Sequence, residues 1–470
     1  METLTVRSKR DIINYVNSHP SGSRRARILA FVALGGIFID AYDFTSLGFG
    51  VDSLQKELSL SAFQLGTVTA IMAFGALIGA LFGGYLVERV GRYKLFTIDL
   101  FLFVVAALGA ALSPNLGWLL FFRFCLGVGV GLDMPASLSF VAEFTNSRDK
   151  GKYVNFWQMM WYCATVCTGL VALVMFLAGA GGELWRWAVG FGAVPALVVL
   201  ALRFRYADES PMWAAHHLGL SEAGRILQKN YDVRVEVEPS EEESMRPSRI
   251  RFGAIFQPGY RARTALASII SGLQSMEYYA VGFYLPTISA LILGKGLLYA
   301  ILGTTVINLF GILGGGTQAF LTRRLGVWRL AVIGCSVAAA SLVVAGTTRG
   351  SISVYLEGLL LGIFILAHSF GQGSQGKTMA AMSYPTEFRG VGTGWAEAMS
   401  RVGSMLGFYV FPLVLAAAGL SHTILYLAAI PLIMLIFLLV IRWEPVGKES
   451  EVEGGLTSTP GRPEAVTPGE

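Results

Sequence analysis

Two long apolar runs of this chain are separated by a short charged stretch, Gly84-Tyr-Leu-Val-Glu88-Arg89-Val-Gly91-Arg92-Tyr-Lys94. A chain that leaves one such run and enters the next has only a few residues in which to reverse, and glycine permits the tight turn that this requires. Arginine and lysine clustered between apolar runs mark the cytoplasmic side of a membrane. The stretch therefore predicts a cytoplasmic loop between two membrane-spanning helices.

The composition extends this prediction to the whole chain. Of the 470 residues, 54% are hydrophobic and 14% are charged, whereas a soluble domain carries about 25% charged residues. Twelve apolar runs approach or exceed the ~20 residues that a spanning helix needs, so we expect an all-α membrane protein with twelve transmembrane helices. The runs cover residues 28–50, 62–87, 95–113, 117–142, 154–178, 185–206, 263–289, 297–321, 327–346, 353–382, 390–417 and 421–441.

The basic residues fall in alternate loops, including the 84–94 stretch, Arg148 to Lys152 and Arg323 to Arg329. Because positively charged loops stay in the cytoplasm, both termini of a multi-pass plasma-membrane protein are expected there. The net charge of +5 is explained by this asymmetry, so we expect no nucleic-acid partner.

The polar interval 207–262 divides six runs from six, and Arg324-Leu-Gly326 in the second half echoes Arg89-Val-Gly91 in the first. Such parallel repetition predicts two pseudo-symmetric six-helix halves. The expected organisation is a cytoplasmic N-terminal segment (1–27), an N-terminal bundle (28–206), a cytoplasmic linker with a short amphipathic helix (207–262), a C-terminal bundle (263–441) and a disordered cytoplasmic tail (442–470).

The 84–94 stretch resembles the signature loop of the major facilitator superfamily, with Glu88 where aspartate is usual. Asp40-Ala-Tyr42-Asp43 and the stretch from Arg123 to Pro135 resemble the phosphate:proton and aromatic-acid:proton symporters of that superfamily. The resemblance implies the twelve-helix fold of the superfamily and transport without a cofactor. Further stretches that look like its sugar-porter and metabolite:proton symporter branches are Trp185-Arg186-Trp187, Glu209-Ser210-Pro211-x-Trp213 and Tyr384-Pro385-Thr386.

Charged residues inside the apolar runs indicate proton coupling. A charge at the bilayer centre costs about 2.5–3.5 kcal/mol, so each needs a partner, an aqueous cavity or a function. A carboxylate beside a buried guanidinium stays ionised, and protonation of Asp43 would release Arg123 and let the halves move. The resemblance implies this role for the pair, and Asp40 and Asp133 are further candidates. The alternative is a structural ion pair between helices 1 and 4.

Polar residues on several predicted helices point to a central substrate site. The guanidinium of Arg401 is a natural bidentate partner for a carboxylate or phosphate, and the resemblance implies a substrate-binding cation at this position. The alternative is a local salt bridge to Glu397, one turn away. The expected substrate-binding residues are Arg401, Glu397, Gln274, Glu277, Tyr278, Gln372 and Gln375.

The charged loops between helices are expected to gate transport rather than bind substrate. Glu88 and Arg89 can pair with charged groups at neighbouring helix ends when the cytoplasmic side is closed. The expected gating residues are Gly84, Glu88, Arg89, Gly91, Arg92, Glu143, Arg148 and Arg389.

The stretch from Gly371 to Thr378 fits the P-loop pattern G-x-x-x-x-G-K-[ST]. A functional P-loop joins a strand to a helix in an aqueous domain, whereas this stretch lies in an apolar run. We therefore expect no nucleotide there, and we place Lys377 near the cytoplasmic end of its helix, where its side chain can reach water.

The leading functional prediction is a proton-coupled symporter of a small organic anion or phosphate that works by alternating access. A proton-coupled sugar or polyol porter is the alternative, although Gln274 stands where sugar porters carry asparagine. A membrane sensor that kept the fold but lost transport is a third possibility. The expected partners are a small molecule, protons and the lipid bilayer. The protein is expected to be a monomer that binds no metal or cofactor and is not an enzyme.

Overall fold

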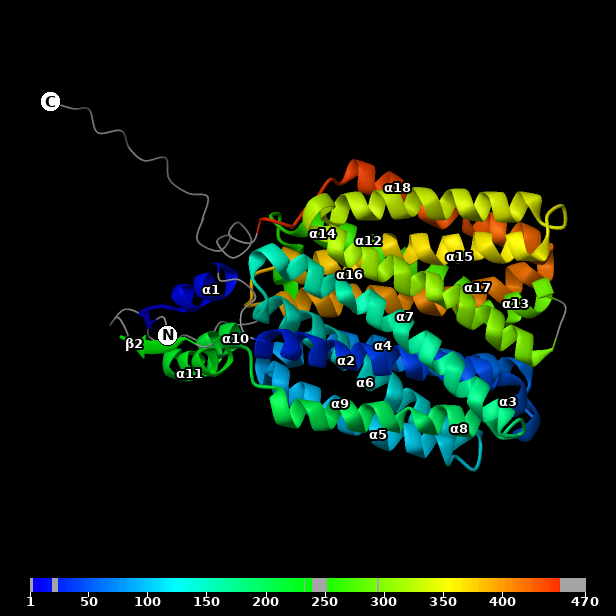
Figure 1. Cartoon of the computed structure of the whole chain (residues 1–470), viewed down its shortest axis with the longest axis horizontal. Coiled ribbons are helices and arrows are strands. Elements are labelled where there is room, and N and C mark those ends of the chain that lie inside the picture. Colours follow the sequence, from blue (N-terminus) through cyan, green and yellow to red (C-terminus); the bar gives the residue numbers. More distant parts are fainter. Residues whose placement is uncertain (1–2, 19–23, 232, 239–251, 294–295, 449–470) are drawn as a thin grey trace.

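A computed structural model describes residues 3–18, 24–231, 233–238, 252–293 and 296–448. Long helices lie side by side and make up most of the molecule, and a small group of short elements sits at one end of them (Figure 1). That end holds the linker between the two halves, and we call it the linker end.

The N-terminal half contains six passes. The sixth pass is made by two consecutive helices, α8 and α9, and a short helix, α3, follows the first pass. The bounds are α2 (Arg24–Phe49), α3 (Val51–Glu57), α4 (Ala62–Val90), α5 (Arg92–Ala111), α6 (Leu116–Phe144), α7 (Ser147–Leu177), α8 (Leu184–Phe191) and α9 (Ala193–Tyr206).

The C-terminal half repeats this arrangement, with two helices that each contain a sharp glycine turn. Gly326 (φ 77°, ψ 166°) lies inside α14 and Gly419 (φ 73°, ψ 171°) lies inside α17. Glycine adopts these positive φ values without the steric cost that a side chain brings, so each of these helices contains the end of one pass and the start of the next. The bounds are α12 (Arg261–Val281), α13 (Leu285–Leu293), α14 (Leu297–Thr348), α15 (Val354–Phe370), α16 (Gln372–Ser383), α17 (Arg389–Leu427) and α18 (Ala429–Val440).

The described helices thus make the twelve predicted passes in two six-helix halves. Nine helical stretches of the described chain are long and apolar enough to cross a membrane on those criteria alone, and the longest contains both passes of α14. The passes that fall outside these criteria are α12 and the part of α17 before Gly419. Both carry several buried polar residues, and both contribute to the cavity between the halves described below.

Polar side chains define where several passes begin. Ser61 and Gln64 form a capping box at the start of α4, and the side chains of Asn115, Asn146 and Ser353 accept backbone N–H groups at the starts of α6, α7 and α15. A side-chain oxygen at this position satisfies a backbone donor that the helix itself cannot.

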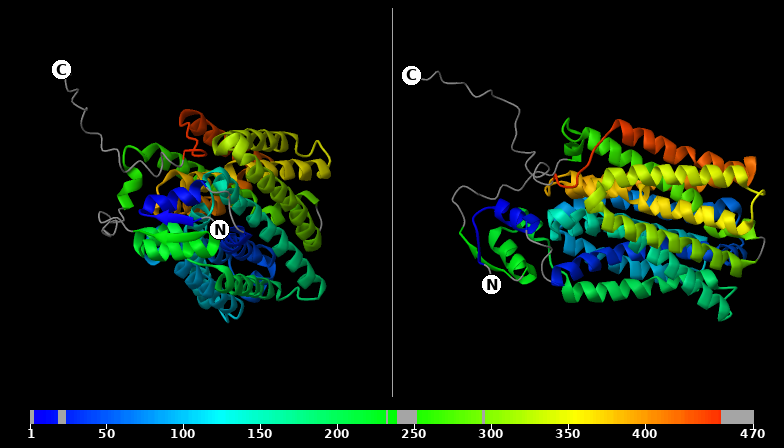
Figure 2. Two further views of the ribbon diagram at one scale, coloured as in Figure 1. Left: turned by 60° about the vertical axis from the view of Figure 1, so that its left-hand side comes forward. Right: turned by 45° about the horizontal axis from the view of Figure 1, so that its top comes forward.

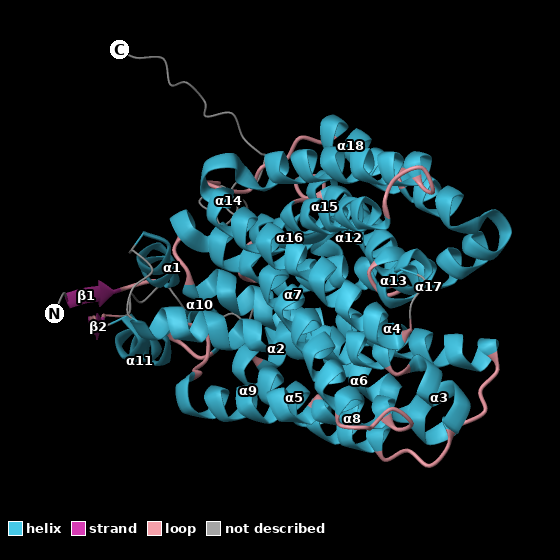
Figure 3. Cartoon of the chain, turned by 45° about the vertical axis from the view of Figure 1, so that its right-hand side comes forward, coloured by secondary structure: helices cyan, strands magenta, loops and turns pink. Residues whose placement is uncertain are grey.

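The short elements at the linker end form a compact unit from two distant segments (Figures 1 and 2). They are β1 (Thr3–Val6), α1 (Lys9–Ser18), α10 (Pro211–His217), α11 (Leu220–Tyr231) and β2 (Arg234–Val237). A further short helix, η1 (Phe252–Phe256), precedes α12 and packs on α12 and α17. β1 and β2 pair in parallel, from Thr3 opposite Arg234 to Val6 opposite Val237, and Figure 3 shows both strands at this end. Val6, Ile12 and Ile226 belong to its small apolar core.

This unit differs from the expected organisation in two respects. The linker contains α10, α11 and a strand rather than one short helix, and the N-terminal segment packs on it. The expected tail of residues 442–470 is ordered at its start, where Trp443 Nε1 donates to Ser383 Oγ at 2.8 Å. A tryptophan whose indole N–H is hydrogen-bonded and whose ring is partly buried is typical of ordered structure and not of a disordered tail. The rest of that tail, residues 449–470, lies outside the described residues.

Candidate functional site

A buried charge network closes the linker end between the two halves. The guanidinium of Arg92, at the start of α5, contacts Glu88 at 3.0 and 3.1 Å and Glu143 at 2.7 Å. All three side chains are fully buried. Glu88 and Glu143 lie at the ends of α4 and α6, so three helices of the N-terminal half meet at one arginine.

The same two carboxylates also bind the C-terminal half. Glu88 Oε1 accepts the backbone N–H of Gly390 at 2.7 Å, and Glu143 Oε1 lies 3.5 Å from Arg389 NH1. Because both contacts cross between α17 and the N-terminal half, separating the halves at this end would break them. This geometry fits the predicted gating role of Glu88, Arg92, Glu143 and Arg389.

The remaining predicted gating residues have different positions. Gly84 lies directly against the backbone of Gly390, where a Cβ atom would clash. Arg89 is exposed and donates to Tyr85 on its own helix at 3.4 Å, so it does not make the interhelical pair that we expected. Arg148 is also exposed. Arg92, three residues after Arg89, is the arginine that faces the other helices.

Gly91 allows the chain to turn between α4 and α5, with φ 102°. Directly after it, the backbone N–H groups of Arg92 and Tyr93 donate to the carboxylate of Glu209 at 3.0 and 3.2 Å. Burial raises the pKa of Glu209, while its backbone hydrogen bonds oppose that rise. Trp213, from the same linker motif, lies with its ring 5.9 Å from the Arg92 guanidinium carbon. The linker thus holds the start of α5 in place.

Asp43 and Arg123 lie next to each other in the membrane portion but do not form a salt bridge in this structure. Arg123 NH1 donates to the backbone carbonyl of Asp43 at 3.3 Å, and both carboxylate oxygens of Asp43 are buried without a hydrogen-bond partner among the described residues. The carboxylate lies against Gly192, between α8 and α9, where a Cβ atom would clash. The two side chains predicted to carry proton coupling are therefore adjacent but do not pair with each other.

Asp133 belongs to a second buried cluster, together with two charged residues that sequence analysis missed. Arg203 bridges Asp99 at 3.3 Å and Asp133 at 3.1 Å, and Asp133 also accepts from Ser137 at 2.9 Å. Asp99 and Arg203 each interrupt an apolar run, and that signal alone could have identified them.

Asp40 is fully buried, and within the part of the chain that the structure describes neither of its carboxylate oxygens has a hydrogen-bond partner. The charges that act on it come from Asp133 and Asp99 on one side and from Arg401 and Glu397 on the other. It therefore lies between the charge cluster of the N-terminal half and a cluster of the C-terminal half.

A small central cavity lies between the two halves. Its volume is about 20 Å³, which is room for about one water molecule. Side chains of α7 line it from the N-terminal half, and side chains of α12, α15, α16 and α17 line it from the C-terminal half. They are Trp157, Gln158, Trp161, Gln274, Ser275, Tyr278, Tyr279, His368, Lys377 and Ser400.

The cation that lines this cavity is Lys377 rather than Arg401. Lys377 is 5% exposed, and its Nζ lies 2.7 Å from Glu397 Oε2. Arg401 pairs with the other oxygen of Glu397 through Nε (2.6 Å) and NH2, and its NH1 donates to Tyr279 at 3.1 Å. Lys377 therefore does not lie at the polar end of its helix, as we expected, but deep inside the protein.

The other predicted substrate residues divide into two groups. Gln274 and Tyr278 line the cavity. Glu277 and Gln372 instead pair with each other at 3.2 Å, and Gln375 donates to Gln318 at 2.7 Å. These three predicted residues therefore lie behind the side chains that line the cavity. The stretch that fits the P-loop pattern forms the start of α16, where residues 372–383 are all buried.

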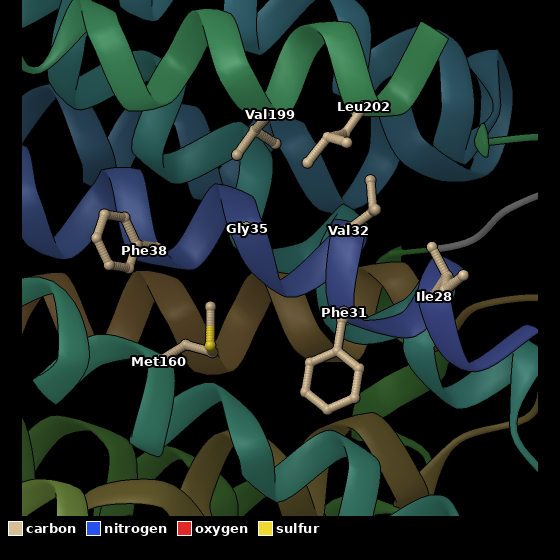
Figure 4. Close-up of a pocket in the computed structure, with 8 residues that line it drawn as sticks. All are labelled: Ile28, Phe31, Val32, Gly35, Phe38, Met160, Val199 and Leu202. Atoms are coloured by element: carbon tan, nitrogen blue, oxygen red, sulfur yellow. The ribbon is translucent and has the colours of Figure 1, made fainter. Parts of the chain in front are cut away.

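A second hollow lies between α2, α7 and α9 (Figure 4). Its lining is apolar and includes Phe31, Phe38, Met160 and Val199. A binding site for a polar molecule needs a few placed polar groups, and this lining offers none. Its chemistry is typical of a surface that faces lipid chains.

Comparison with known proteins identifies the family. The sequence profile described as "Sugar (and other) transporter" matches residues 31–452. The chain belongs to this transporter family. It is a multi-pass membrane protein of the major facilitator superfamily and transports a small molecule rather than catalysing a reaction.

The curated relatives of this transporter include proteins with different substrates. It is 27% identical to "Putative metabolite transport protein YaaU" of Escherichia coli, with 85% of this chain and 87% of that protein covered. It is 26% identical to "Niacin transporter NiaP" of Acinetobacter baylyi (94% and 100% covered) and 25% identical to "Glucose transporter GlcP" of Staphylococcus epidermidis (89% and 94% covered).

Among solved structures, the proton:xylose symporter XylE bound to 6-bromo-6-deoxy-D-glucose superposes on this transporter with a TM-score of 0.78. The sequences are 20% identical, and 93% of this chain and 99% of that chain are covered. At this identity the likeness establishes the fold.

Proposed function

We propose that this transporter is a proton-coupled symporter of a small organic anion. The observation that carries the proposal is the ammonium group of Lys377, which lines the cavity between the two halves. A buried cation needs an anionic partner, and an intramembrane charge in a transporter indicates a substrate or ion pathway by default.

The charges around the cavity favour an anionic substrate. Lys377 and Arg401 share one carboxylate, that of Glu397, so the three groups together carry one excess positive charge. Ionised Asp40, whose charge acts on both cations, compensates this excess. When Asp40 is protonated, a substrate anion can take its place.

This arrangement couples proton and substrate by charge balance. An anion binds best when Asp40 carries a proton. Loss of the proton therefore weakens binding of the anion, and loss of the anion weakens binding of the proton. The groups that face Asp40 are Asp99 on α5, Asp133 on α6, Tyr279 on α12, Lys377 on α16, and Glu397 and Arg401 on α17. Asp43, whose buried carboxylate also has no hydrogen-bond partner in the described ranges, is the second candidate carrier.

The closed linker end supports transport by alternating access. Separation of Arg389 and Gly390 from Glu143 and Glu88 would open the cavity on that side, which we propose is the cytoplasmic side. The charge asymmetry of the loops supports this orientation and would put both termini in the cytoplasm.

A sugar or polyol is the second candidate substrate. Gln274, Ser275 and Ser400 line the cavity and can bind hydroxyl groups, and one curated relative is a glucose transporter. A neutral sugar, however, does not require Lys377.

Uptake by purified transporter in proteoliposomes tests the proposal. We expect an inward proton gradient to drive accumulation of a small organic acid, whereas a sugar should not accumulate. Accumulation of xylose or glucose with no uptake of any acid would replace the proposal with the sugar porter. Specific binding of an organic acid without net or exchange transport would indicate the sensor.

A further inference from the structure

The apolar hollow between α2, α7 and α9 is a groove of considerable size (Figure 4). Its volume is about 630 Å³, which falls in the range of about 300–1,000 Å³ that is usual for ligand pockets. Phe31 and Leu202, which line it, are 45% and 39% exposed. The groove therefore opens to the outside of the helix bundle, which is lipid in the membrane portion of the transporter.

The length of the groove matches one leaflet of a bilayer. Its lining on α2 extends from Ile28 to Phe38, and this separation corresponds to a rise of about 15 Å along the helix. The hydrocarbon core of a bilayer is ~30 Å thick. Because Ile28 lies near the linker end of α2 and Phe38 near its middle, the groove can take one acyl chain from the leaflet at the linker end.

The floor of the groove is formed where α2 and α9 approach each other closely. A Cβ atom at Gly35 would lie 2.9 Å from the side chain of Val199, so the two helices meet there with no side chain from α2 between them. The side chains of Phe31 and Phe38 stand on either side of this position along α2 (Figure 4). An acyl chain in the groove would contact three helices, whereas a flat surface would contact it on one side.

A cation stands at the mouth of the groove on α9. Val199, Leu202 and Arg205 follow one another at a spacing of three residues, which places them on one face of a helix. The first two line the groove, and Arg205, one turn nearer the linker end, is exposed. The guanidinium of Arg205 therefore lies just beyond the apolar lining, at the level where a lipid carries its phosphate.

A second cation stands on α7. Lys152, Phe156 and Met160 share one face of this helix, at a spacing of four residues. Met160 lines the groove, and the ring of Phe156 lies 5.6 Å from that of Phe31. The ammonium group of Lys152 lies 4.6 Å from the centre of the Phe320 ring. It thus stands beside the groove on the linker side, across α2 from α9.

Neither Arg205 nor Lys152 forms an ion pair with a carboxylate within the described ranges, where each contacts an aromatic ring instead. By contrast, Lys229 in the linker pairs with Asp208 at 2.6 Å. Cations at a membrane surface attract anionic lipid headgroups. An apolar groove with two such cations at one end is complementary to both parts of an anionic phospholipid.

We propose that this groove is a binding site for an anionic phospholipid from the leaflet at the linker end. One acyl chain lies against Phe31, Met160 and Leu202. The phosphate group pairs with Arg205 and Lys152. The site is separate from the cavity between the halves, so it does not depend on which substrate is transported.

The lipid would support the helix that carries the proposed proton carriers. On the face of α2 opposite the groove, the carbonyl of Ala33 accepts Ser137 Oγ of α6 at 2.9 Å, and Gly36 lies against the carboxylate of Asp133. Asp40 is on this same face. A chain bound in the groove backs α2 where α6 does not, so we expect the lipid to stabilise the N-terminal half.

Native mass spectrometry of the purified full-length transporter tests the site with two lipids. Dioleoylphosphatidylglycerol is anionic and dioleoylphosphatidylcholine is zwitterionic, whereas their acyl chains are identical. Each basic residue near an anionic lipid surface contributes a factor of about five in affinity. We therefore expect phosphatidylglycerol to bind roughly tenfold or more tightly than phosphatidylcholine, and to raise the melting temperature further.

Variants separate the two parts of the site. Arg205→Gln should weaken binding of phosphatidylglycerol about fivefold and leave phosphatidylcholine unchanged, and the addition of Lys152→Gln should remove the preference. Leu202→Trp fills the groove and should weaken binding of both lipids. The matched controls are Arg324→Gln, an exposed cation at the linker end of α14, and Leu313→Trp, a 60% exposed position on α14. Both should bind the two lipids as the wild type does.

Three results would each overturn the inference. They are equal affinity of the wild type for the two lipids, an unchanged preference in the folded Arg205→Gln/Lys152→Gln variant, and binding by Leu202→Trp as tight as by Leu313→Trp. If Leu202→Trp does not fold, the double variant decides, because it changes side chains at the mouth and none of the apolar lining. All of these measurements leave the proposed symport untouched, since they do not involve the cavity between the halves.

Discussion

Glu209 and Glu444 occupy equivalent places in the two halves of this transporter. Glu209 accepts the backbone N–H groups of Arg92 and Tyr93 directly after Gly91, and Glu444 accepts that of Trp328 at 3.0 Å, two residues after Gly326. Both glycines have positive φ. Each half therefore uses the chain that follows its sixth pass to hold the start of its third.

The two carboxylates should stabilise the protein as helix N-terminal acceptors. We expect Glu209→Ala and Glu444→Ala each to lower the free energy of unfolding by about 0.5–2 kcal/mol, the usual loss for such an acceptor. Thermal melts in detergent measure this. Glu222→Ala is the control, since Glu222 makes an exposed pair with Arg225 on α11. If all three variants melt alike, the two acceptors do not stabilise the halves.

Glu209 should also contribute a pH dependence to stability. Burial raises the pKa of Glu209, so the folded protein binds this proton more tightly than the unfolded chain does. The stabilisation that comes from this proton is present at acidic pH and is lost as the pH rises through the raised pKa. Glu209→Gln keeps an acceptor oxygen but does not titrate. We expect the melting temperature of this variant to depend less on pH in the range where Glu209 titrates. The same pH dependence as in the wild type would contradict a contribution from Glu209.

Arg389 should control opening of the linker end. Because it holds Glu143 across the two halves, Arg389→Ala should reduce transport rate with little change in substrate affinity. Arg89→Ala is the matched control, since Arg89 is exposed and contacts Tyr85 of its own helix, and it should transport nearly normally. Initial rates and equilibrium binding on the same preparations distinguish the two effects. A larger rate loss in the Arg89 variant would favour the role that sequence analysis assigned to it.

Gly84 should be required for closure of the linker end. A side chain there would meet the backbone of Gly390 and the Cα of Gly394, so Gly84→Val should leave the halves apart at that end and abolish turnover. Gly66→Val on the same helix meets nothing within 4 Å and should be active. Reactivity of a cysteine placed in the cavity toward a membrane-impermeant reagent from the linker side measures closure. Equal reactivity in wild type and Gly84→Val would refute this prediction.

The proton-carrying roles of Asp40 and Asp43 can be separated. Asp40→Asn leaves the excess positive charge of Lys377, Arg401 and Glu397 uncompensated, so we expect anion binding to remain but to lose its dependence on pH. Asp43→Asn should abolish accumulation driven by a proton gradient and leave exchange measurable. Paired uptake and exchange assays at several pH values test both variants. An Asp43→Asn variant that still accumulates substrate would assign the coupling to Asp40.

For the proposed gate, sequence analysis named residues that meet in the structure but did not show how they pair. It marked Glu88, Arg92, Glu143 and Arg389 because they stand in charged loops at matching positions, and these four meet in the structure. It treated Arg89 as their equal, because nothing in a linear pattern shows which of two arginines faces neighbouring helices. The direction of each side chain depends on where α4 ends and how α5 begins at Gly91.

For the proposed substrate site, sequence analysis named Gln274 and Tyr278, which line the cavity, and Arg401, which does not, whereas Lys377 is the cation of the lining. Arg401 resembled a binding residue, whereas Lys377 was assigned to a helix end. The actual positions depend on α15 ending at Phe370 and α16 beginning at Gln372, which sets how far inside the protein Lys377 lies. Trp157, whose indole nitrogen has no hydrogen-bond partner among the described side chains and backbone groups, carried no signal that distinguished it from a packing residue.

The sequence by itself determined the membrane environment, the twelve passes and the two-half plan, because these depend on local properties: the length and apolar content of each run, and the glycines and charges between runs. Only the tertiary structure decided which buried charges pair, because partners such as Arg203 and Asp133, or Lys377 and Glu397, come from different helices. Their distances depend on how the helices rotate and pack against one another. The same packing leaves the carboxylates of Asp40 and Asp43 without hydrogen-bond partners among the residues that the structure describes, and no pattern along the chain reveals that.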